Sequence, residues 1–338
     1  MILPLSLTQK PSFSIPTRLR RLRSSSAIRT LVEETTLQKK DFVQPLFLQE
    51  GKCSIEEITS MPHVFRYSID EAKKKIAFCL EKGIFSFALF PVISHEKKSF
   101  HAREALSEEG VIPQALIELK KSFPEAYFIV DIALDPYTSH GHDGLLDERG
   151  EVANDPTIDV LQKMSILYAS CGADMLAPSD MMDGRIGCIR KALDDAGWQA
   201  AALLSYSAKY ASTFYGPFRN AVKAGSLQGT KASYQLNPAN KREALLEAEL
   251  DAKEHADILM IKPAGHYVDI ISSIKSQTKR PIAAYHVSGE YAMILAAEEK
   301  GIFSAEKAFF EVFLSIKRAG ADLIFTYAID YILPYLEK

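Results

Sequence analysis

The chain of 338 residues has few cysteines and no long hydrophobic run. Its four cysteines, Cys53, Cys79, Cys171 and Cys188, lie far apart and form no CxxC pair. The sequence therefore predicts neither a disulfide framework nor a thiolate zinc site, and a reducing compartment fits best. No apolar stretch approaches the roughly 20 residues that a membrane-spanning helix needs. We expect a soluble protein with no membrane partner.

The chain also has no excess of basic residues over acidic ones. The chain carries 40 Lys and Arg against 43 Asp and Glu, for a formal net charge of -3. Because nucleic-acid recognition usually shows as a basic face, we expect no nucleic-acid partner. The content of 47% hydrophobic and 25% charged residues is typical of globular proteins. Small-molecule chemistry is the favoured class of function.

Acidic residues are absent before Glu33, and this opening is rich in Ser and Arg. That composition is typical of organelle transit peptides. The compact run Arg18 to Arg23 equally predicts a basic arm that docks onto a neighbouring subunit. We divide the chain into an oligomerisation arm, residues 1–35, and a catalytic domain, residues 36–338. We expect a cytoplasmic protein, with organelle targeting by the arm as the alternative.

The rest of the chain alternates short buried strands with helices. Strands are expected at residues 42–48, 84–90, 127–134, 173–177, 200–206, 258–261, 281–286 and 322–327. Helices are expected at 70–82, 113–122, 156–171, 184–196, 241–255, 290–300 and 305–319, with Asp70 as the first N-cap and Gly83 as the first stop. This order predicts a (β/α)8 TIM barrel, with a doubly wound open sheet as the alternative. No GxGxxG follows the first strand, which disfavours the open dinucleotide-binding sheet.

Two lysines stand where predicted strands end. Lys262 follows the apolar run at 258–261, and a buried lysine loses its proton readily, as Schiff-base formation requires. Its alternative is a side chain that extends to solvent. Lys209 follows the preceding strand, and barrel strands present their carboxyl ends to one cavity. Two ammonium groups there each oppose protonation of the other. Asp131, at the end of another strand, is placed to stabilise iminium charge and to transfer protons.

Several long runs resemble a single family. They are SYSAKYASTFYGPFR (205–219), MIKPA (260–264), VSGEY (287–291), DPYTSHGHDG (135–144), APSDMMDGR (177–185) and RLRRLR (18–23). Through nearly the whole chain they are similar to the porphobilinogen synthase, or 5-aminolevulinate dehydratase, family. The resemblance implies a hydro-lyase of tetrapyrrole and heme biosynthesis. It would condense two 5-aminolevulinate molecules to porphobilinogen, with loss of two waters, through Schiff bases on two lysines.

The resemblance also assigns residues to the two substrates. It implies that Lys262 holds the first substrate, on the P side, and that Lys209 holds the second, on the A side. The implied carboxylate-binding residues are Ser288 and Tyr327 on the P side and Arg219, Lys231 and Gln235 on the A side. An Arg and a Lys in the long polar segment 207–240 suit a carboxylate clamp and a lid. The resemblance further implies a homo-oligomer, an octamer, with the arm wrapped around a neighbour.

The metal-related positions depart from the best-known branch of that family. Where the zinc-dependent branch has three cysteines, this chain has Ala133, Asp135 and Asp143. Thiolates select zinc, whereas carboxylates and water suit magnesium, so no catalytic zinc is expected. The resemblance instead implies a regulatory magnesium at Glu247, away from the active site. The alternative is that Glu247 is an ordinary exposed helix residue.

Other features leave alternatives open. His140 and His142 form an HxH pair, for which we favour a role in structuring the loop over metal binding. His286 stands where the family usually has Gln, which is expected to alter hydrogen bonding in the cavity or its response to pH. A class I aldolase also needs a barrel lysine, although it has no use for the second. A barrel without activity, kept for assembly, is the alternative from outside the enzymes.

Overall fold

The computed structural model describes residues 15–223, 227 and 229–336. The chain divides into two compact units, Met1–Thr36 and Leu37–Lys338. The described part of the first unit holds a 3-10 turn, η1 (Leu19–Arg23), and helix α1 (Ser26–Leu31), whose N-cap Ser25 accepts a hydrogen bond from the Ile28 amide. No residue of η1 or α1 is buried. None of the helices within the described ranges has the length and apolar character needed to cross a membrane.

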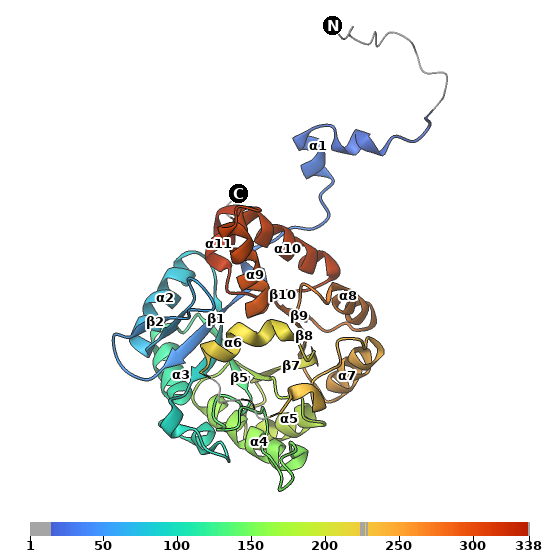
Figure 1. Cartoon of the computed structure of the whole chain (residues 1–338). Coiled ribbons are helices and arrows are strands. Elements are labelled where there is room, and N and C mark those ends of the chain that lie inside the picture. Colours follow the sequence, from blue (N-terminus) through green and yellow to red (C-terminus); the bar gives the residue numbers. More distant parts are fainter. Residues whose placement is uncertain (1–14, 224–226, 228, 337–338) are drawn as a thin grey trace. The chain divides into compact units, whose positions relative to one another are not determined.

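The second unit is built on a closed parallel barrel (Figure 1). Its strands are β1 (Phe42–Gln49), β4 (Ser86–Val92), β5 (Tyr127–Ile132), β6 (Met175–Pro178), β7 (Ala202–Lys209), β8 (Ile258–Lys262), β9 (Ile282–Tyr285) and β10 (Leu323–Phe325). Each pairs in parallel with the next, and β10 pairs with β1 at Phe42 and Ile324. This last pairing closes the sheet, so the predicted (β/α)8 barrel is confirmed and the open-sheet alternative is wrong.

Helices surround the strands in Figure 1. They are α2 (Ile69–Glu81), α3 (Val111–Ser122), α4 (Asn154–Ser170), α5 (Arg185–Asp195), α7 (Arg242–Lys253), α8 (Val268–Gln277), α9 (Ser288–Glu299), α10 (Ala305–Ala319) and α11 (Ile329–Leu336). Helix α10 shows why they pack on the barrel, since its Phe309, Phe313 and Ile316 are buried at helical spacing. The interior of the barrel is correspondingly filled by apolar strand residues.

Some elements differ from the sequence prediction. Helices α8 and α11 and the hairpin of β2 (Ile55–Glu57) and β3 (Phe65–Tyr67) were not predicted. The β-branched run in α8 weakens the local helix signal, and packing against the barrel overrides it. The predicted N-cap of α2 is wrong: Ser68 occupies that position. Asp70 lies in the first turn, where it accepts a hydrogen bond of 2.9 Å from the Cys53 amide.

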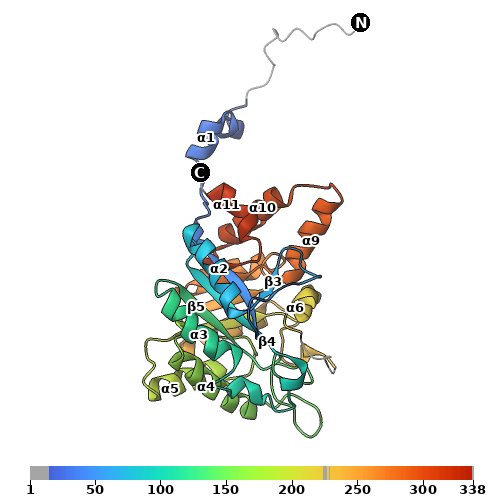
Figure 2. The same ribbon diagram turned by 90° about the vertical axis from the view of Figure 1, so that its left-hand side faces the viewer.

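The long polar segment after β7 covers one end of the barrel. Strand β7 extends to Lys209, beyond its predicted end, and is followed by η5 (Thr213–Tyr215), α6 (Gly216–Ala221) and η6 (Lys231–Ser233). Figures 1 and 2 show α6 lying across the ring of strands at one end. The segment approaches α9 closely, because a Cβ at Gly289 would lie 2.5 Å from the Phe214 carbonyl oxygen. We call the described residues of this range, 210–223, 227 and 229–237, the lid segment.

Candidate active site

Lys262 is the last residue of β8 and has aromatic neighbours. Its Nζ lies 4.4 Å from the ring centre of Tyr285, 5.0 Å from Tyr206, 5.1 Å from Phe218 and 5.4 Å from Tyr215. The side chain is buried, and no carboxylate of the described residues forms an ion pair with it. Burial, and then the nearby ammonium of Lys209, lower the pKa of Lys262 to about 7. Much of this amine is therefore unprotonated at neutral pH, as a nucleophile requires.

Lys209 ends the neighbouring strand, and its Cα pairs with that of Lys262. Its surroundings are polar. The Nζ donates to Asp143 Oδ2 at 2.9 Å and to the Ser179 carbonyl oxygen. Both lysines are buried, at 6% and 7% exposure, so the barrel brings two buried amines to paired positions at the same end of the sheet. The sequence prediction placed them together for the same reason, that parallel strands end at one face.

Asp143 joins Lys209 to the lid segment. Its second oxygen, Oδ1, accepts a hydrogen bond of 2.5 Å from Lys231, which also contacts Asp135 Oδ2 at 3.2 Å. Burial opposes ionisation of Asp143, but the ammonium groups of Lys209 and Lys231 outweigh it and hold the pKa of this carboxyl well below its usual range. Asp143 is therefore a carboxylate between two ammonium groups. The contact ties the loop after β5 to the lid segment.

Asp131 is a third ionisable group near the two lysines. It lies on β5, it is buried, and its Oδ1 has no hydrogen-bond partner among the described residues. Burial, and then the carboxylate of Asp135, raise the pKa of Asp131 to about 7, against the opposing charges of Lys262 and Lys209. A carboxyl and an amine with pKa values near 7 can exchange a proton at neutral pH.

The proposed A-side clamp residues lie together in the lid segment. Arg219, Lys231 and Gln235 line one cavity of about 410 Å³ with Ser212. Arg219 is exposed and Gln235 is buried. Lys231 is not free in this state, because Asp135 and Asp143 hold its ammonium. A substrate carboxylate entering here would compete with those two aspartates.

The proposed P-side residues each reach Lys262 through an aromatic neighbour. The Tyr327 hydroxyl lies 2.9 Å from that of Tyr285, whose ring faces the Lys262 amine. The Ser288 hydroxyl accepts a hydrogen bond of 3.0 Å from the Phe218 amide and donates to the Phe214 carbonyl at 3.3 Å. Ser288 thus fastens the lid segment in this structure.

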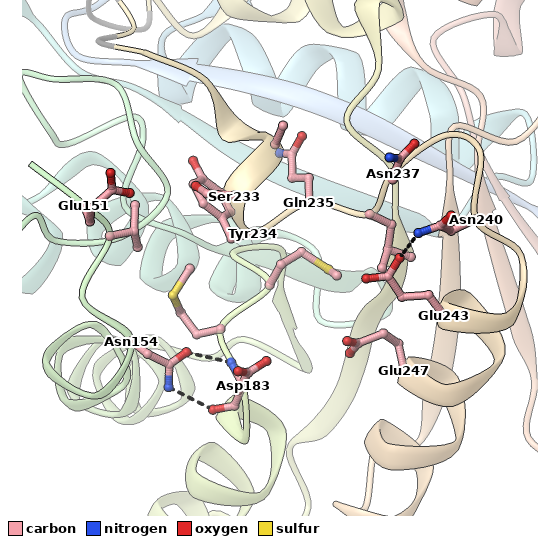
Figure 3. Close-up of a pocket in the computed structure, with 15 residues that line it drawn as sticks. Glu151, Asn154, Asp183, Ser233, Tyr234, Gln235, Asn237, Asn240, Glu243 and Glu247 are labelled. Atoms are coloured by element: carbon pink, nitrogen blue, oxygen red, sulfur yellow. Dashed lines mark hydrogen bonds between the residues drawn. The ribbon is translucent and has the colours of Figure 1, made fainter.

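Glu247 lies in a different place, on α7. Its half-buried side chain faces a polar cavity of about 450 Å³ that Asp183, Glu243 and Asn154 also line (Figure 3). Burial, and then the carboxylate of Asp251, raise the pKa of Glu247 to about 7. A cation in this cavity would relieve that repulsion. The cavity shares Gln235 with the lid-segment cavity.

The histidines stabilise loops in this structure. The Nδ1 atom of His140 accepts from the His142 amide at 3.2 Å, and the His142 ring lies 3.1 Å from the Tyr234 hydroxyl. His286 is buried against Phe309 and Phe313, with its Nδ1 3.3 Å from Thr326 Oγ1. Burial lowers the pKa of His286. The side chain therefore favours the neutral form at neutral pH.

The aromatic residues around Lys262 were missed by sequence reasoning. Tyr206, Tyr215 and Phe218 lie in the same run as Lys209, residues 205–219, and Tyr285 directly precedes His286. Their position beside a strand-end lysine becomes visible only when the barrel closes. Alternation along β9 was the available signal for Tyr285, since it predicts which residues of a regular strand face the interior.

A parallel barrel with two buried lysines on paired strand ends, one of them with a pKa near 7, has the groups that enzymes of the Schiff-base class require. Comparison with known proteins specifies it further. The profile of the family described as Delta-aminolevulinic acid dehydratase matches residues 16–334. The chain therefore belongs to this family, and its activity is that of a porphobilinogen synthase, a hydro-lyase of porphyrin and heme biosynthesis.

Individual relatives agree along the whole chain. A Delta-aminolevulinic acid dehydratase of Chlamydia pneumoniae is 46% identical over 327 residues, which are 97% of this chain and 98% of that protein. One from Methanothermobacter thermautotrophicus is 45% identical over 92% of this chain and 94% of its own. The crystal structure of the Toxoplasma gondii enzyme in complex with the reaction product porphobilinogen has a TM-score of 0.93 and 44% identity. It covers 95% of this chain and 92% of its own.

Proposed function

We propose that the chain condenses two 5-aminolevulinate molecules through imines on Lys262 and Lys209. The observation that carries this proposal is the pairing of the two Cα atoms at the ends of β7 and β8, with both side chains buried. A class I aldolase needs one such lysine, and an inactive barrel needs neither. A second buried amine, with Arg219 and Gln235 in a cavity of the adjoining lid segment, supports a reaction that joins two carbonyl substrates.

The first imine forms at Lys262. Its unprotonated amine adds to the carbonyl carbon of the first substrate, and water leaves. Asp131, with a pKa near 7, donates the proton that the departing water needs and then faces the iminium as a carboxylate. Tyr327 and Ser288 are the proposed partners of this substrate's carboxylate. Binding there would require Ser288 to exchange its hydrogen bonds to the lid segment.

The second imine forms at Lys209 with loss of the second water. The carboxylate of this substrate enters beside Arg219 and replaces Asp135 or Asp143 as the partner of Lys231. A proton lost from the carbon next to the imine gives an enamine, whose carbon attacks the imine carbon at Lys262. The amine of the first substrate then displaces Lys209 from its carbon. Departure of the Lys262 amine and loss of a ring proton complete the pyrrole.

Borohydride trapping with 5-aminolevulinate tests this route, beside a colour assay for porphobilinogen. We expect colour, and adducts at both Lys262 and Lys209 in peptide maps. Adduct at a single lysine without colour would indicate an aldolase-like site. No adduct at either lysine would indicate an inactive barrel.

We further propose that the enzyme works without catalytic zinc and responds to magnesium at Glu247. Ala133, Asp135 and Asp143 offer no thiolate, and the two aspartates already hold ammonium groups. The oxygen-rich cavity at Glu247 fits a hydrated magnesium ion, which usually keeps several waters and takes one or two carboxylates. When bound, the ion would supply a positive charge that favours one assembled state. Of the described residues, only Cys53, Asp70 and Glu71 converge as a three-residue group that could ligate an ion directly.

The metal proposal predicts that activity survives a zinc-selective chelator and rises with millimolar magnesium. In Glu247→Ala the magnesium response should disappear, because the carboxylate that attracts the ion is gone. Glu249→Ala is the matched control, since Glu249 lies on the same helix and pairs with Lys253 at the surface. Zinc bound stoichiometrically to active protein, with activity lost on its removal, would overturn the zinc-free reading. A magnesium response retained in Glu247→Ala would overturn the placement of the ion.

We also propose a cytoplasmic homo-octamer in which the arm, residues 1–35, wraps a neighbouring subunit. The exposed apolar side chains of the arm, Leu19, Leu22 and Leu31, support a partner for it. Deleting residues 1–30 should give smaller and less active species on size-exclusion chromatography. An elution volume that corresponds to the same subunit number as the parent would refute the role of the arm.

A further inference from the structure

One extra residue in β7 determines where Lys209 points. Ser205 and Ala208 of β7 pair with Leu259 and Ile261 of β8, so three steps along β7 match two along β8. This is the signature of a β-bulge, which is common beside active sites. Side chains alternate between the two faces of a strand, and one extra residue reverses the alternation beyond it.

The bulge therefore allows two functional residues to face the interior together. Tyr206, within it, presents its ring 5.0 Å from the Lys262 amine, and Lys209, after it, donates to Asp143. The two are three positions apart and would face opposite sides of a regular strand. Ser205 faces outward, where its hydroxyl donates to Asp251 of α7 at 2.5 Å.

A buried arginine makes hydrogen bonds to this bulge. Arg185, at the start of α5, is 2% exposed, and its Nη2 donates to Ser205 Oγ at 3.1 Å and to the Tyr206 carbonyl at 3.3 Å. The guanidinium lies between two buried carboxylates, 3.6 Å from Asp180 and 3.5 Å from Asp251. Asp180 follows Ser179, whose carbonyl accepts from Lys209. The same group of charges thus borders both the bulge and the oxygen that Lys209 contacts.

We propose that Arg185 is a positioning residue that holds the bulge of β7 and thereby directs Lys209 into the cavity that Lys262 faces. The inference rests on the proposed two-lysine function and adds what orients the second lysine. A guanidinium is required because its fixed fork reaches Ser205 Oγ and the Tyr206 carbonyl while its other nitrogens face the carboxylates. A lysine in its place keeps the charge between Asp180 and Asp251 but lacks that fork.

The test is Arg185→Lys, with Arg190→Lys as the matched control. Arg190 is on the same helix, and it bonds the Ala201 and Trp198 carbonyls at the opposite end of β7. After borohydride trapping with 5-aminolevulinate, Arg185→Lys should lose about tenfold or more of the Lys209 adduct and retain the Lys262 adduct within about twofold. Arg190→Lys should resemble the parent at both lysines. Equal loss at both lysines in Arg185→Lys, or no loss at Lys209, would overturn the proposal.

A crystal structure of Arg185→Lys tests the proposal independently of the reaction. Lys209 Nζ should leave Asp143 and the Ser179 carbonyl, whereas an unchanged Lys209 would overturn the inference even if the parent forms no adduct there. Should Arg185→Lys fail to fold, Ser205→Ala removes one contact of the bulge and leaves the ion pairs. It should lower the Lys209 adduct alone, and an unaltered ratio of the two adducts would likewise overturn the proposal.

Discussion

Lys262 and Lys209 end neighbouring strands, yet their surroundings are opposite in character. Aromatic rings of Tyr206, Tyr215, Phe218 and Tyr285 surround the first, and no ion pair with a described residue holds it. A carboxylate and a carbonyl oxygen hold the second. Apolar walls disfavour an ammonium at Lys262. Two lysines on paired strand ends thus have different surroundings before any substrate enters.

This difference gives the order in which the amines become reactive. Lys262 is ready at neutral pH because burial has lowered its pKa to about 7. Lys209 must first part from Asp143, which holds its Nζ at 2.9 Å. In the proposed route the first substrate would therefore bind at Lys262 and the second at Lys209. The order agrees with the roles that the family resemblance implied.

Removing either amine should have the largest effect. Lys262→Met and Lys209→Met should each lower turnover roughly a thousandfold or more, because each imine is obligatory. They should differ in trapping: Lys209→Met retains the Lys262 adduct, whereas Lys262→Met loses its own. Near-normal turnover in either variant would contradict the two-lysine route.

The variant Lys262→Met also reports the free-energy cost of burying the Lys262 amine. The folded-state pKa, about 7, lies below the unfolded value of about 10.4. The unfolded chain thus binds more protons between these values, so this residue makes parental stability rise with pH across that window. Lys262→Met should exceed the parent in unfolding free energy at pH 7, by a margin that shrinks toward pH 10. A margin independent of pH in urea titrations would contradict the lowered pKa.

Asp143→Asn tests the polar surroundings of Lys209. It leaves the ammonium groups of Lys209 and Lys231 buried without their shared carboxylate, at a cost of roughly 3 kcal/mol in unfolding free energy. Because the pKa of Asp143 lies below its unfolded value of about 3.9, this contribution is present above that pH and is lost as pH falls through the folded value.

Asp147→Asn is the control for this variant. Asp147 lies in the same loop and pairs with Arg149 near the surface, so its loss should change stability by less than about 1 kcal/mol. Equal stability of Asp143→Asn and Asp147→Asn in urea titrations would show that the buried pairs contribute nothing.

The sequence alone predicted the barrel and the neighbouring positions of the two lysines, because both follow from the local pattern of residues. Alternating strands and helices predict the fold, and strand ends then place Lys209 beside Lys262. The Asp143 bridge was not predictable in this way, since it joins residues 66 and 88 positions apart. Nor was the bulge at Ser205 to Ala208, because a reversed alternation in one strand becomes apparent only against its partner.

The smallest effect is expected from placing a carboxylate beside Lys262. This variant is also the most direct test of the contrast between the two lysines. Phe218 of α6 lies 5.1 Å from its amine, and Phe218→Glu would place a negative charge there. An opposite charge at this range typically shifts a pKa by about 1 to 3 units, here upward from about 7. The pH midpoint of borohydride trapping at Lys262 should rise accordingly, with little change at Lys209. Phe218→Leu, which keeps the wall apolar, should leave the midpoint near 7, and an equal midpoint in both variants would mean that the aromatic surroundings do not determine the reactivity of this amine.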